Sequence, residues 1–222
     1  MPVLLELFAG TQSVSRAFSL RGWTCLTLDL VQDPHAEPLT YQTDILTWDF
    51  TNVPRPDCIW ASPPCTEYSI ARTTGGPRNY ALADAIVQKT LEIIHYLQPR
   101  VWFIENPATG YLHTRDFMQA LPEPRLISYC QYGFPYRKNT HIWSNEAENP
   151  DWETFRCPGK GRCSKMIDGR HILIAQRGQT DRAVPNLSTR TLYRIPPSLC
   201  AEIADFATDI CATALEAVSG PI

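Results

Sequence analysis

The sequence predicts an α/β fold in which helices cover both faces of a mostly parallel sheet. Short apolar, β-rich runs alternate with helical patterns along roughly the first 130 residues, and this alternation is typical of a parallel sheet covered on both sides. The chain has 222 residues, 44% of them hydrophobic, which is enough for one sizeable core. We therefore expect one domain with a small irregular appendage.

The predicted elements follow one another in a regular order. Strands are expected in VLLEL (3–7), TCLTLDL (24–30), DCIWA (57–61), VWFIE (101–105) and LISYC (126–130). Helices are expected in SVSRAFSLRG (13–22) and over about residues 80–97. In the second helix the residues at 86, 90, 93, 94 and 97 share one face, which is the spacing of a helix packed against a sheet.

The eight cysteines indicate a reducing compartment. They fall in apolar, strand-like runs, where a free thiol behaves as a small buried hydrophobe. The N-terminus, MPVLLELFAG, lacks the charged region and cleavage site of a secretory signal. No apolar run approaches the roughly 18 residues of a membrane span, so no membrane association is expected.

The net charge of −3 conceals an uneven distribution of charge. Residues 125–194 hold 12 Lys and Arg against six Asp and Glu, whereas the remainder holds eight against 17. A basic region inside an acidic protein fits a polyanion that docks on one face, although an ordinary solvated surface is the alternative.

Three candidate ligand-binding residues lie near the ends of successive predicted strands. Gly10 follows the first strand and permits a tight turn before a helix N-terminus. Asp29 closes the second strand about 20 residues later, where an acid commonly binds the ribose hydroxyls of an adenosine-containing cofactor. Asp44, in QTDIL, is placed to accept a hydrogen bond from an adenine amino group. Together they favour a nucleoside cofactor over a set of turn and capping residues.

Two further strand ends carry candidate catalytic residues. In ASPPCTEYS, two prolines fix φ at the exit from a strand, so Cys65 is held at the edge of the sheet in the position of a nucleophile. Glu105 ends the adjacent predicted strand, in VWFIENPATG. A partly desolvated carboxyl there is suited to keep a proton and donate it to a ring nitrogen. The pair argues against a merely structural thiol at Cys65.

Four stretches carry a resemblance to a known family. ELFAGTQSVSRAF, SPPCTEYS, ENP and YGFPYRKNTHIWS occur in this chain in the order and spacing of the DNA (cytosine-5)-methyltransferases, particularly the compact phage-like members. The resemblance covers roughly residues 3–145, and YRIPPSLCAEI is a weaker match to the last motif of the family. A tyrosine in place of Cys65 would indicate methylation of an amino group, whereas the cysteine selects ring-carbon chemistry.

The resemblance implies a Rossmann-like, S-adenosylmethionine-dependent methyltransferase fold, and methylation of cytosine carbon 5 in DNA. A Cys65 thiolate would add to carbon 6 of a flipped-out base while Glu105 supports protonation at N3. Arg137, in the fourth stretch, is expected to contact the base and its phosphate. The adjacent Lys138 is expected to bind DNA. The residues expected to bind the cofactor are Phe8, Ala9, Gly10, Ser13, Asp29, Asp44 and Pro63. Two departures from the family pattern are Gln12, where a glycine is usual, and Leu192-Tyr193, where a Gly-Asn pair is usual.

The chain is divided accordingly into a catalytic core (1–145), a reduced target-recognition segment (146–192) and a C-terminal segment (193–222) whose helix returns to the core. The stretch after Cys65, TEYSIARTTGGPRNY, is expected to close over the flipped base. In it Gly75 and Gly76 would supply flexibility, while Arg72 and Arg78 would contact phosphates.

The recognition segment contains RCPGKGRCSKMIDGRH, which offers potential metal ligands in Cys157, Cys163 and His171. Such ligands suit zinc, with a fourth from Cys130 or His141, but the spacing is not that of a standard zinc finger, and a metal-free basic loop remains the alternative. In either case four cations make this segment the expected DNA-facing element: Lys160, Arg162, Lys165 and Arg170.

Two other functions remain open at this stage. A tRNA-directed cytosine-5 methyltransferase would use the same chemistry, and a catalytically inactive DNA-binding module would keep the fold. The intact Cys65 and Glu105 argue against the inactive module. We expect a monomer that binds DNA, located in the cytoplasm of a bacterial or phage-infected cell, or in the nucleus of a eukaryote.

Overall fold

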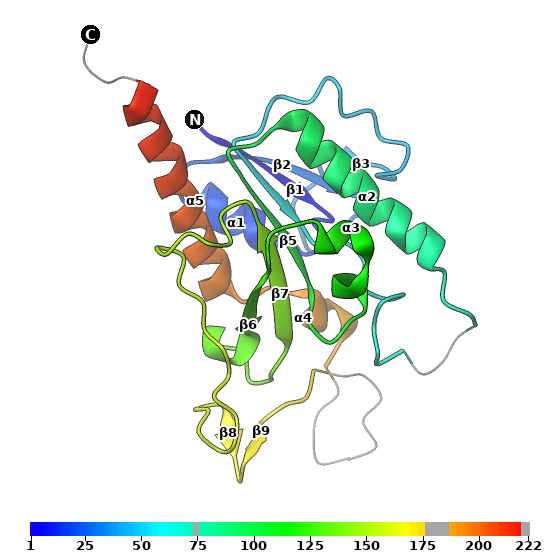
Figure 1. The fold of residues 1–222 in the computed structure, drawn as a ribbon, viewed down its shortest axis with the longest axis vertical. Coiled ribbons are helices and arrows are strands. Elements are labelled where there is room, and N and C mark those ends of the chain that lie inside the picture. The colour runs from blue at the N-terminus through cyan, green and yellow to red at the C-terminus, as the bar shows by residue number, and fades with distance from the viewer. Residues whose placement is uncertain (73–75, 176–186, 219–222) are drawn as a thin grey trace.

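The computed structural model describes residues 1–72, 76–175 and 187–218, and within them the chain forms a seven-stranded sheet and a separate hairpin (Figure 1). The sheet strands are β1 (Val3–Leu7), β2 (Thr24–Asp29), β3 (Tyr41–Gln42), β4 (Cys58–Ala61), β5 (Val101–Pro107), β6 (Arg125–Ser128) and β7 (Asn139–Ser144). The hairpin pairs β8 (Met166–Ile167) with β9 (Arg170–His171). Gly75 and residues 176–186 of the predicted recognition segment lie outside the described ranges.

The strand order is β3-β2-β1-β4-β5-β7-β6. Pairing is parallel from β3 through β5, and β7 runs antiparallel to both of its neighbours. The prediction of a mostly parallel sheet is therefore confirmed. The connection after β1 runs to β2 on one side, whereas the connection after β4 runs to β5 on the other, so a crevice opens between the carboxyl ends of β1 and β4.

Helices cover both faces of the sheet, as predicted. They are α1 (Ser13–Ser19), α2 (Tyr80–Leu97), α3 (Asp116–Gln119), α4 (Thr189–Tyr193) and α5 (Pro197–Val218), with short 3₁₀ helices η1 (Leu112–Thr114) and η2 (Tyr129–Tyr132). Alternate residues of β1 face opposite sides: Leu4 packs in the core shared with α1 and α5, and Leu5 in the core shared with α2. This alternation is the two-residue period of a strand buried on both faces.

The helix α5 returns from the C-terminal part of the chain to lie against α1 (Figure 1). Arg21, just after α1, donates two hydrogen bonds to the Asp205 carboxylate, and the Trp23 indole N–H donates to the Thr208 hydroxyl at 3.0 Å. These bonds supplement the apolar contact between the helices. No helix in the described ranges is both long and apolar enough to cross a membrane.

Two local differences separate the sequence prediction from the structure. The strand expected over 126–130 ends at Ser128, and its last two residues begin η2. The stretch NTHIWS, which the sequence analysis used only as a motif, forms β7 between β5 and β6. An antiparallel strand inserted between two others is set by tertiary pairing, so the local pattern did not reveal it.

Candidate active site

The loop after β1 is shaped by left-handed backbone. Phe8, Gly10 and Gln12 have φ values of 60°, 47° and 54°, which is a conformation that glycine adopts most readily. The Gly10 N–H donates to Asp29 Oδ2 at 2.8 Å, and this bond ties the loop to the end of β2. Gln12 takes the left-handed position without glycine, and its side-chain amide donates to the Glu37 carbonyl at 2.7 Å.

Glu6, inside β1, is a buried acid that the sequence analysis did not single out. Its carboxylate accepts hydrogen bonds from the Ser15 backbone N–H at 2.9 Å and from the Ser15 hydroxyl, so it caps the first turn of α1. Burial raises the pKa of Glu6 to about 7, although the bonds from Ser15 lower it. In the sequence it reads as one polar position in a strand, and only the three-dimensional contact with α1 reveals its role.

The turn after β4 places Cys65 at the edge of the sheet. The Pro63 carbonyl accepts a hydrogen bond from the Asn106 side chain at 2.9 Å, so the Pro-Pro-Cys and Glu-Asn-Pro stretches hold each other. The Cys65 carbonyl accepts from the backbone N–H groups of Tyr68 and Ser69, which closes a turn directly after the thiol. Cys65 is a free, half-buried thiol.

Glu105 lies in β5 beside this turn, buried and bonded to two donors. The Tyr129 hydroxyl donates to Glu105 Oε1 at 3.0 Å, and Lys138 Nζ lies 3.4 Å from the same oxygen. Burial raises the pKa of Tyr129 well above its ordinary value, and Glu105 adds to the effect, so Tyr129 remains a donor. Burial likewise raises the pKa of the Cys65 thiol, Lys138 lowers it, and Glu105 raises it. Lys138 is therefore the group that favours the thiolate in this site.

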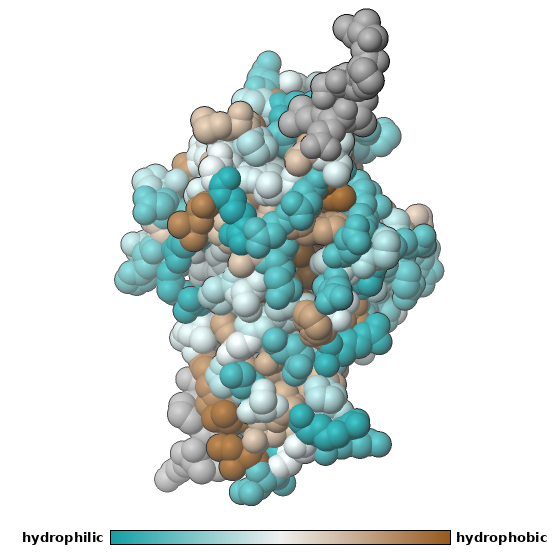
Figure 2. Space-filling model, turned by 90° about the vertical axis from the view of Figure 1, so that its left-hand side faces the viewer, coloured by the Kyte–Doolittle hydropathy of each residue, from teal (hydrophilic) through white to brown (hydrophobic). Residues whose placement is uncertain are grey.

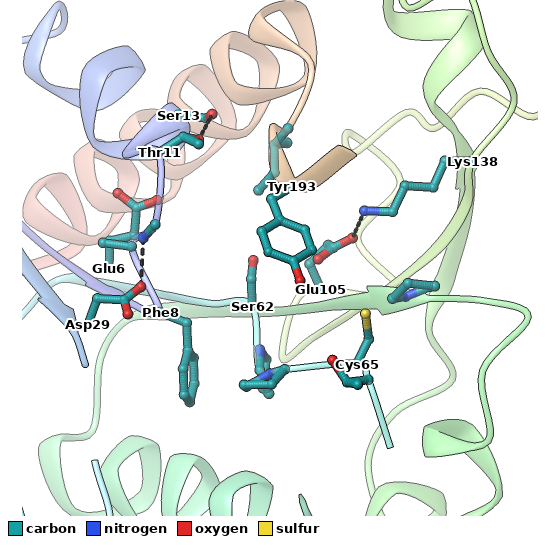
Figure 3. Close-up of a pocket in the computed structure, with 17 residues that line it drawn as sticks. Glu6, Phe8, Thr11, Ser13, Asp29, Ser62, Cys65, Glu105, Lys138 and Tyr193 are labelled. Carbon is teal, nitrogen blue, oxygen red and sulfur yellow. Dashed lines mark hydrogen bonds and ion pairs between the residues drawn. The ribbon is translucent and has the colours of Figure 1, made fainter. Parts of the chain in front are cut away.

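These groups meet in one cavity of about 280 Å³. Figure 3 shows Asp29, Glu6 and Phe8 at one end, and Cys65 with Glu105 at the other. Of the residues predicted to bind a cofactor, six line this cavity: Phe8, Ala9, Gly10, Ser13, Asp29 and Pro63. The parallel strands thus bring Glu6 and Glu105, which are 99 positions apart in the chain, into one site, as expected for ligand sites at strand ends.

Two predicted site residues lie elsewhere. Asp44 does not line the cavity, and its carboxylate accepts the backbone N–H of Leu46 at 3.0 Å in a local turn. Arg137 lines a separate groove against the hairpin, while the adjacent Lys138 enters the cavity. The base contact assigned to Arg137 and the adenine contact assigned to Asp44 stay predictions.

Arg72 and Arg78, predicted to contact phosphates, are bonded within the stretch that follows Cys65. Arg72 pairs with the Glu67 carboxylate, and Arg78 donates to the carbonyls of Glu67 and Ser69. The Asn79 backbone N–H donates to the same carboxylate at 2.7 Å. Glu67 therefore links Arg72 to the Asn79 backbone at the start of α2. Together with the bonds of Arg78, this link holds the stretch after Cys65 in its present conformation.

Tyr193 also lines the cavity, although it belongs to the Leu192-Tyr193 pair that departs from the family pattern. In Figure 3 its ring lies between the Asp29 end and the Glu105 end. Sequence reasoning missed this residue because it comes 55 positions after Lys138, the cavity residue that precedes it in the chain. Ser188 caps the N-terminus of α4, and its side chain accepts the Thr191 N–H at 3.1 Å. This serine was the local signal for the helix that carries Tyr193.

The predicted DNA-facing cations gather around the hairpin. Lys160, Arg162 and Arg170 are exposed and Lys165 is half-buried. Among the described residues none of the four forms an ion pair with a carboxylate. Their charges are therefore available for a polyanion.

Comparisons with known proteins place these features in context. No protein-family model matches the chain. The chain is 33% identical to the "Probable DNA (cytosine-5)-methyltransferase" of Frog virus 3, over 91% of this chain and 98% of the viral protein. It is 25% identical to the type II methyltransferase M.AplI of Arthrospira platensis, over 61% of this chain but 43% of that protein.

A solved structure has a similar fold. It belongs to a protein described as a DNA modification methyltransferase encoded within an E. coli prophage, with a TM-score of 0.50 at 17% identity. The match covers 82% of this chain and 56% of the prophage protein. Together with the strand order, this likeness confirms the predicted Rossmann-like methyltransferase fold.

Proposed function

The chain belongs to the DNA (cytosine-5)-methyltransferase family, and from this premise we propose that it methylates carbon 5 of cytosine in DNA with S-adenosylmethionine as the donor. The observation that supports this assignment best is the meeting of Cys65, Glu105 and Lys138 at one end of the cavity whose other end holds Asp29. A thiol, a carboxyl and a cation are the groups that addition to a pyrimidine ring requires.

The Asp29 end of the cavity fits S-adenosylmethionine, which supplies an electrophilic methyl group when bound. Carboxylate oxygens of Asp29 and Glu6 offer acceptors to hydroxyl and ammonium groups, and Phe8 offers an aromatic surface to a base. The positive φ of Gly10 keeps the loop backbone close to the cavity wall. We assign cofactor binding to the six residues that line the cavity, while a contact from Asp44 would require a movement of its turn.

At the other end we propose that Cys65, as a thiolate, forms a bond to carbon 6 of the cytosine ring. Glu105 holds a proton at N3, which lets the electron pair displaced from the ring double bond make carbon 5 nucleophilic. Transfer of the methyl group to carbon 5 would leave S-adenosylhomocysteine as the second product. Loss of the carbon-5 proton to a base then restores the double bond and releases the Cys65 thiolate. Lys138 lies beside Glu105 and favours the thiolate, so we assign to it the role of the cation in the cavity in preference to Arg137.

Access to carbon 6 requires the base to leave the duplex, at a cost of a few kcal/mol. The stretch after Cys65 is our candidate for the segment that closes over the flipped base. For Arg72 and Arg78 to reach phosphates, their bonds to Glu67 and to the loop carbonyls would have to be exchanged for bonds to DNA. Glu67 is thus the residue that holds the stretch in the conformation described here.

Recognition of the target is assigned to the segment 146–192, between the core (1–145) and the C-terminal segment (193–222). The exposed cations of the hairpin and the groove that contains Arg137 support this division. So short a segment offers few side chains to base edges, and each base pair read needs its own contact in the groove. We therefore expect a target of about two to four base pairs.

The test is transfer of a labelled methyl group to duplex DNA by the wild-type chain and by Cys65→Ala. The variant should lose transfer but keep the thermal shift caused by S-adenosylmethionine, because the thiol lies at the far end of the cavity from Asp29. Cys25→Ser, a change at a thiol outside the cavity, is the matched control and should keep transfer.

Undiminished transfer by Cys65→Ala would remove the covalent mechanism. Transfer to tRNA but not to duplex DNA would replace the proposed substrate. Bisulfite sequencing of DNA from cells that express the chain gives the methylated pattern.

A further inference from the structure

Four potential metal ligands converge beside the hairpin. The three sulfur atoms and one imidazole nitrogen lie within 4.8 Å of one another, and they come from Cys130, Cys157, Cys163 and His171. We propose that these four residues bind a structural zinc ion. The fourth ligand that the sequence left open is thus Cys130, in η2, and His141 lies outside the group.

The geometry matches a tetrahedral zinc site. With Zn–S bonds of about 2.3 Å and Zn–N bonds of about 2.0 Å, a sulfur and a nitrogen ligand stand about 3.5 Å apart and two sulfurs about 3.8 Å apart. Cys157 Sγ lies 3.5 Å from His171 Nε2. All eight cysteines are free, so the short separations are not disulfide bonds. Three thiolates and an imidazole are a ligand set that selects zinc among the common divalent ions.

Two of these cysteines, Cys130 and Cys163, are buried outside the hydrophobic core. Cys58, Cys200 and Cys211 are buried within the hydrophobic core, where a free thiol serves as a small apolar side chain. Cys130 and Cys163 are equally buried, yet among the described residues they belong to neither core cluster. Each instead has the other potential ligand atoms within 4.8 Å and the Gln131 side-chain amide within hydrogen-bond distance, which fits the environment of a ligand.

A second layer of hydrogen bonds surrounds the group. The Gln131 side-chain amide donates to Cys163 Sγ at 3.3 Å and to Cys130 Sγ at 3.6 Å. The Met166 backbone N–H donates to the Cys163 carbonyl at 3.0 Å, which fixes the turn that carries this sulfur. Donors aimed at the sulfurs stabilise thiolates and orient them, as outer-shell partners do in metal sites.

The hairpin needs such a link because it has little core of its own. Its two strands have two residues each, and an isolated hairpin is marginal in water. Apolar side chains face solvent at this end of the molecule (Figure 2), where Ile167 is 65% exposed. The loop before it runs through three consecutive left-handed residues, Gly159, Lys160 and Gly161. An ion bound by Cys130 of η2, by the two cysteines of this loop and by His171 of β9 would link the loop and the hairpin to η2, which directly follows β6 of the sheet.

The charge of the site also agrees with its surroundings. Zinc with three thiolates and a neutral imidazole carries a net charge of −1, and binding releases up to three thiol protons. Lys160 and Arg170 line the adjacent groove together with Arg137 and His171. These cations oppose the excess negative charge of the site.

The experiment measures zinc in the full chain, purified without a histidine tag and under reducing conditions. We expect one zinc ion per chain. Chelation followed by addition of Co²⁺ should give the visible bands of tetrahedral cobalt and the near-ultraviolet band of thiolate ligation. A wild-type chain that contains no zinc and gives no such bands overturns the proposal, as does a disulfide among the three cysteines found by mass spectrometry. Neither result depends on methyltransferase activity.

Variants identify the ligands. Cys163→Ser and His171→Ala should each lose the ion, whereas His171→Cys should keep it with a cobalt spectrum shifted toward four thiolates. His141→Ala and Cys25→Ser are the matched controls and should retain one zinc ion per chain, because both residues lie outside the group. A full zinc content in Cys163→Ser, or loss of zinc in His141→Ala alone, overturns the assignment.

Discussion

Glu6 makes the stability of the fold depend on pH in a direction opposite to that of most acids. The carboxyl is buried, with 2% of its residue surface exposed, and burial raises its pKa from 4.5 to about 7. Below about pH 4.5 it is protonated in both the folded and the unfolded chain. Between about 4.5 and 7 the folded chain keeps a proton that the unfolded chain has lost. The free energy of unfolding contributed by this group is therefore fully present at low pH and is lost as the pH rises to about 7.

The size of the effect follows from the shift. Each unit of pKa difference corresponds to about 1.4 kcal/mol, so a rise from 4.5 to about 7 amounts to roughly 3 kcal/mol across the window. This is a large part of the stability of an ordinary domain. The side chain is fully buried, so solvent screens the effect little.

The assay is urea unfolding of the wild-type chain and of Glu6→Gln, without cofactor and with zinc at a fixed free concentration, from pH 5 to pH 8. Glutamine keeps the shape and an oxygen for the Ser15 N–H but does not titrate. The wild-type chain should lose roughly 2 to 3 kcal/mol relative to the variant as the pH rises. Glu92→Gln, a change at an exposed acid paired with Lys89 on α2, should keep the wild-type slope. Parallel curves for wild type and Glu6→Gln would refute the reasoning.

Three further predictions concern the site. Asp29→Ala should reduce the rise in melting temperature caused by S-adenosylmethionine, because a ribose acceptor and the bond to the β1 loop are lost. An undiminished rise in this variant would remove the assignment. Lys138→Met should move the rising limb of the pH–rate profile to higher pH, because this cation lowers the pKa of Cys65, the proposed nucleophile, and Lys138→Arg should restore the limb. An unmoved limb in Lys138→Met contradicts the role. Replacing Lys160 and Arg162 by Ala should weaken binding to all duplexes and reduce the slope of log binding constant against log salt concentration by about one unit per lost contact. A relaxed methylation pattern would instead indicate that these residues read bases, and unaltered binding would place target recognition elsewhere in the chain.

Much of the fold and of the cavity could be predicted from the sequence because local signals sufficed. Alternating strands and helices determine a parallel sheet, and a parallel sheet brings the ends of its strands to one edge. Gly10, Asp29, Cys65 and Glu105 could therefore be brought together without knowledge of any contact. Asp44 does not line the cavity because it lies two residues past the end of β3, where the chain has already turned and the carboxylate bonds its own backbone, so its contact with adenine stays a prediction.

The features that escaped prediction depend on contacts distant in sequence. Arg137 and Lys138 are adjacent, yet the first lines the groove against the hairpin and the second enters the cavity. Both directly precede β7, and the local pattern did not reveal that strand. Cys130 is 27 residues before the next cysteine of its group, so spacing alone did not select it over His141. Glu6 reads as a polar residue in a strand until the helix that it caps is placed against it.

The adjacency of Arg137 and Lys138 has a mechanical consequence. Arg137 lines the groove against the hairpin, and Lys138 lies beside Glu105 in the cavity. The Leu173 N–H, just past β9, donates to the Pro135 carbonyl at 3.1 Å, which ties the hairpin to the same short stretch. A displacement of the hairpin, by loss of the proposed zinc ion or by binding of DNA, would therefore act on the segment that carries Lys138, and Lys138 lowers the pKa of Cys65. The hairpin of the proposed recognition segment and the Cys65 thiol are thus coupled through the four residues from Pro135 to Lys138.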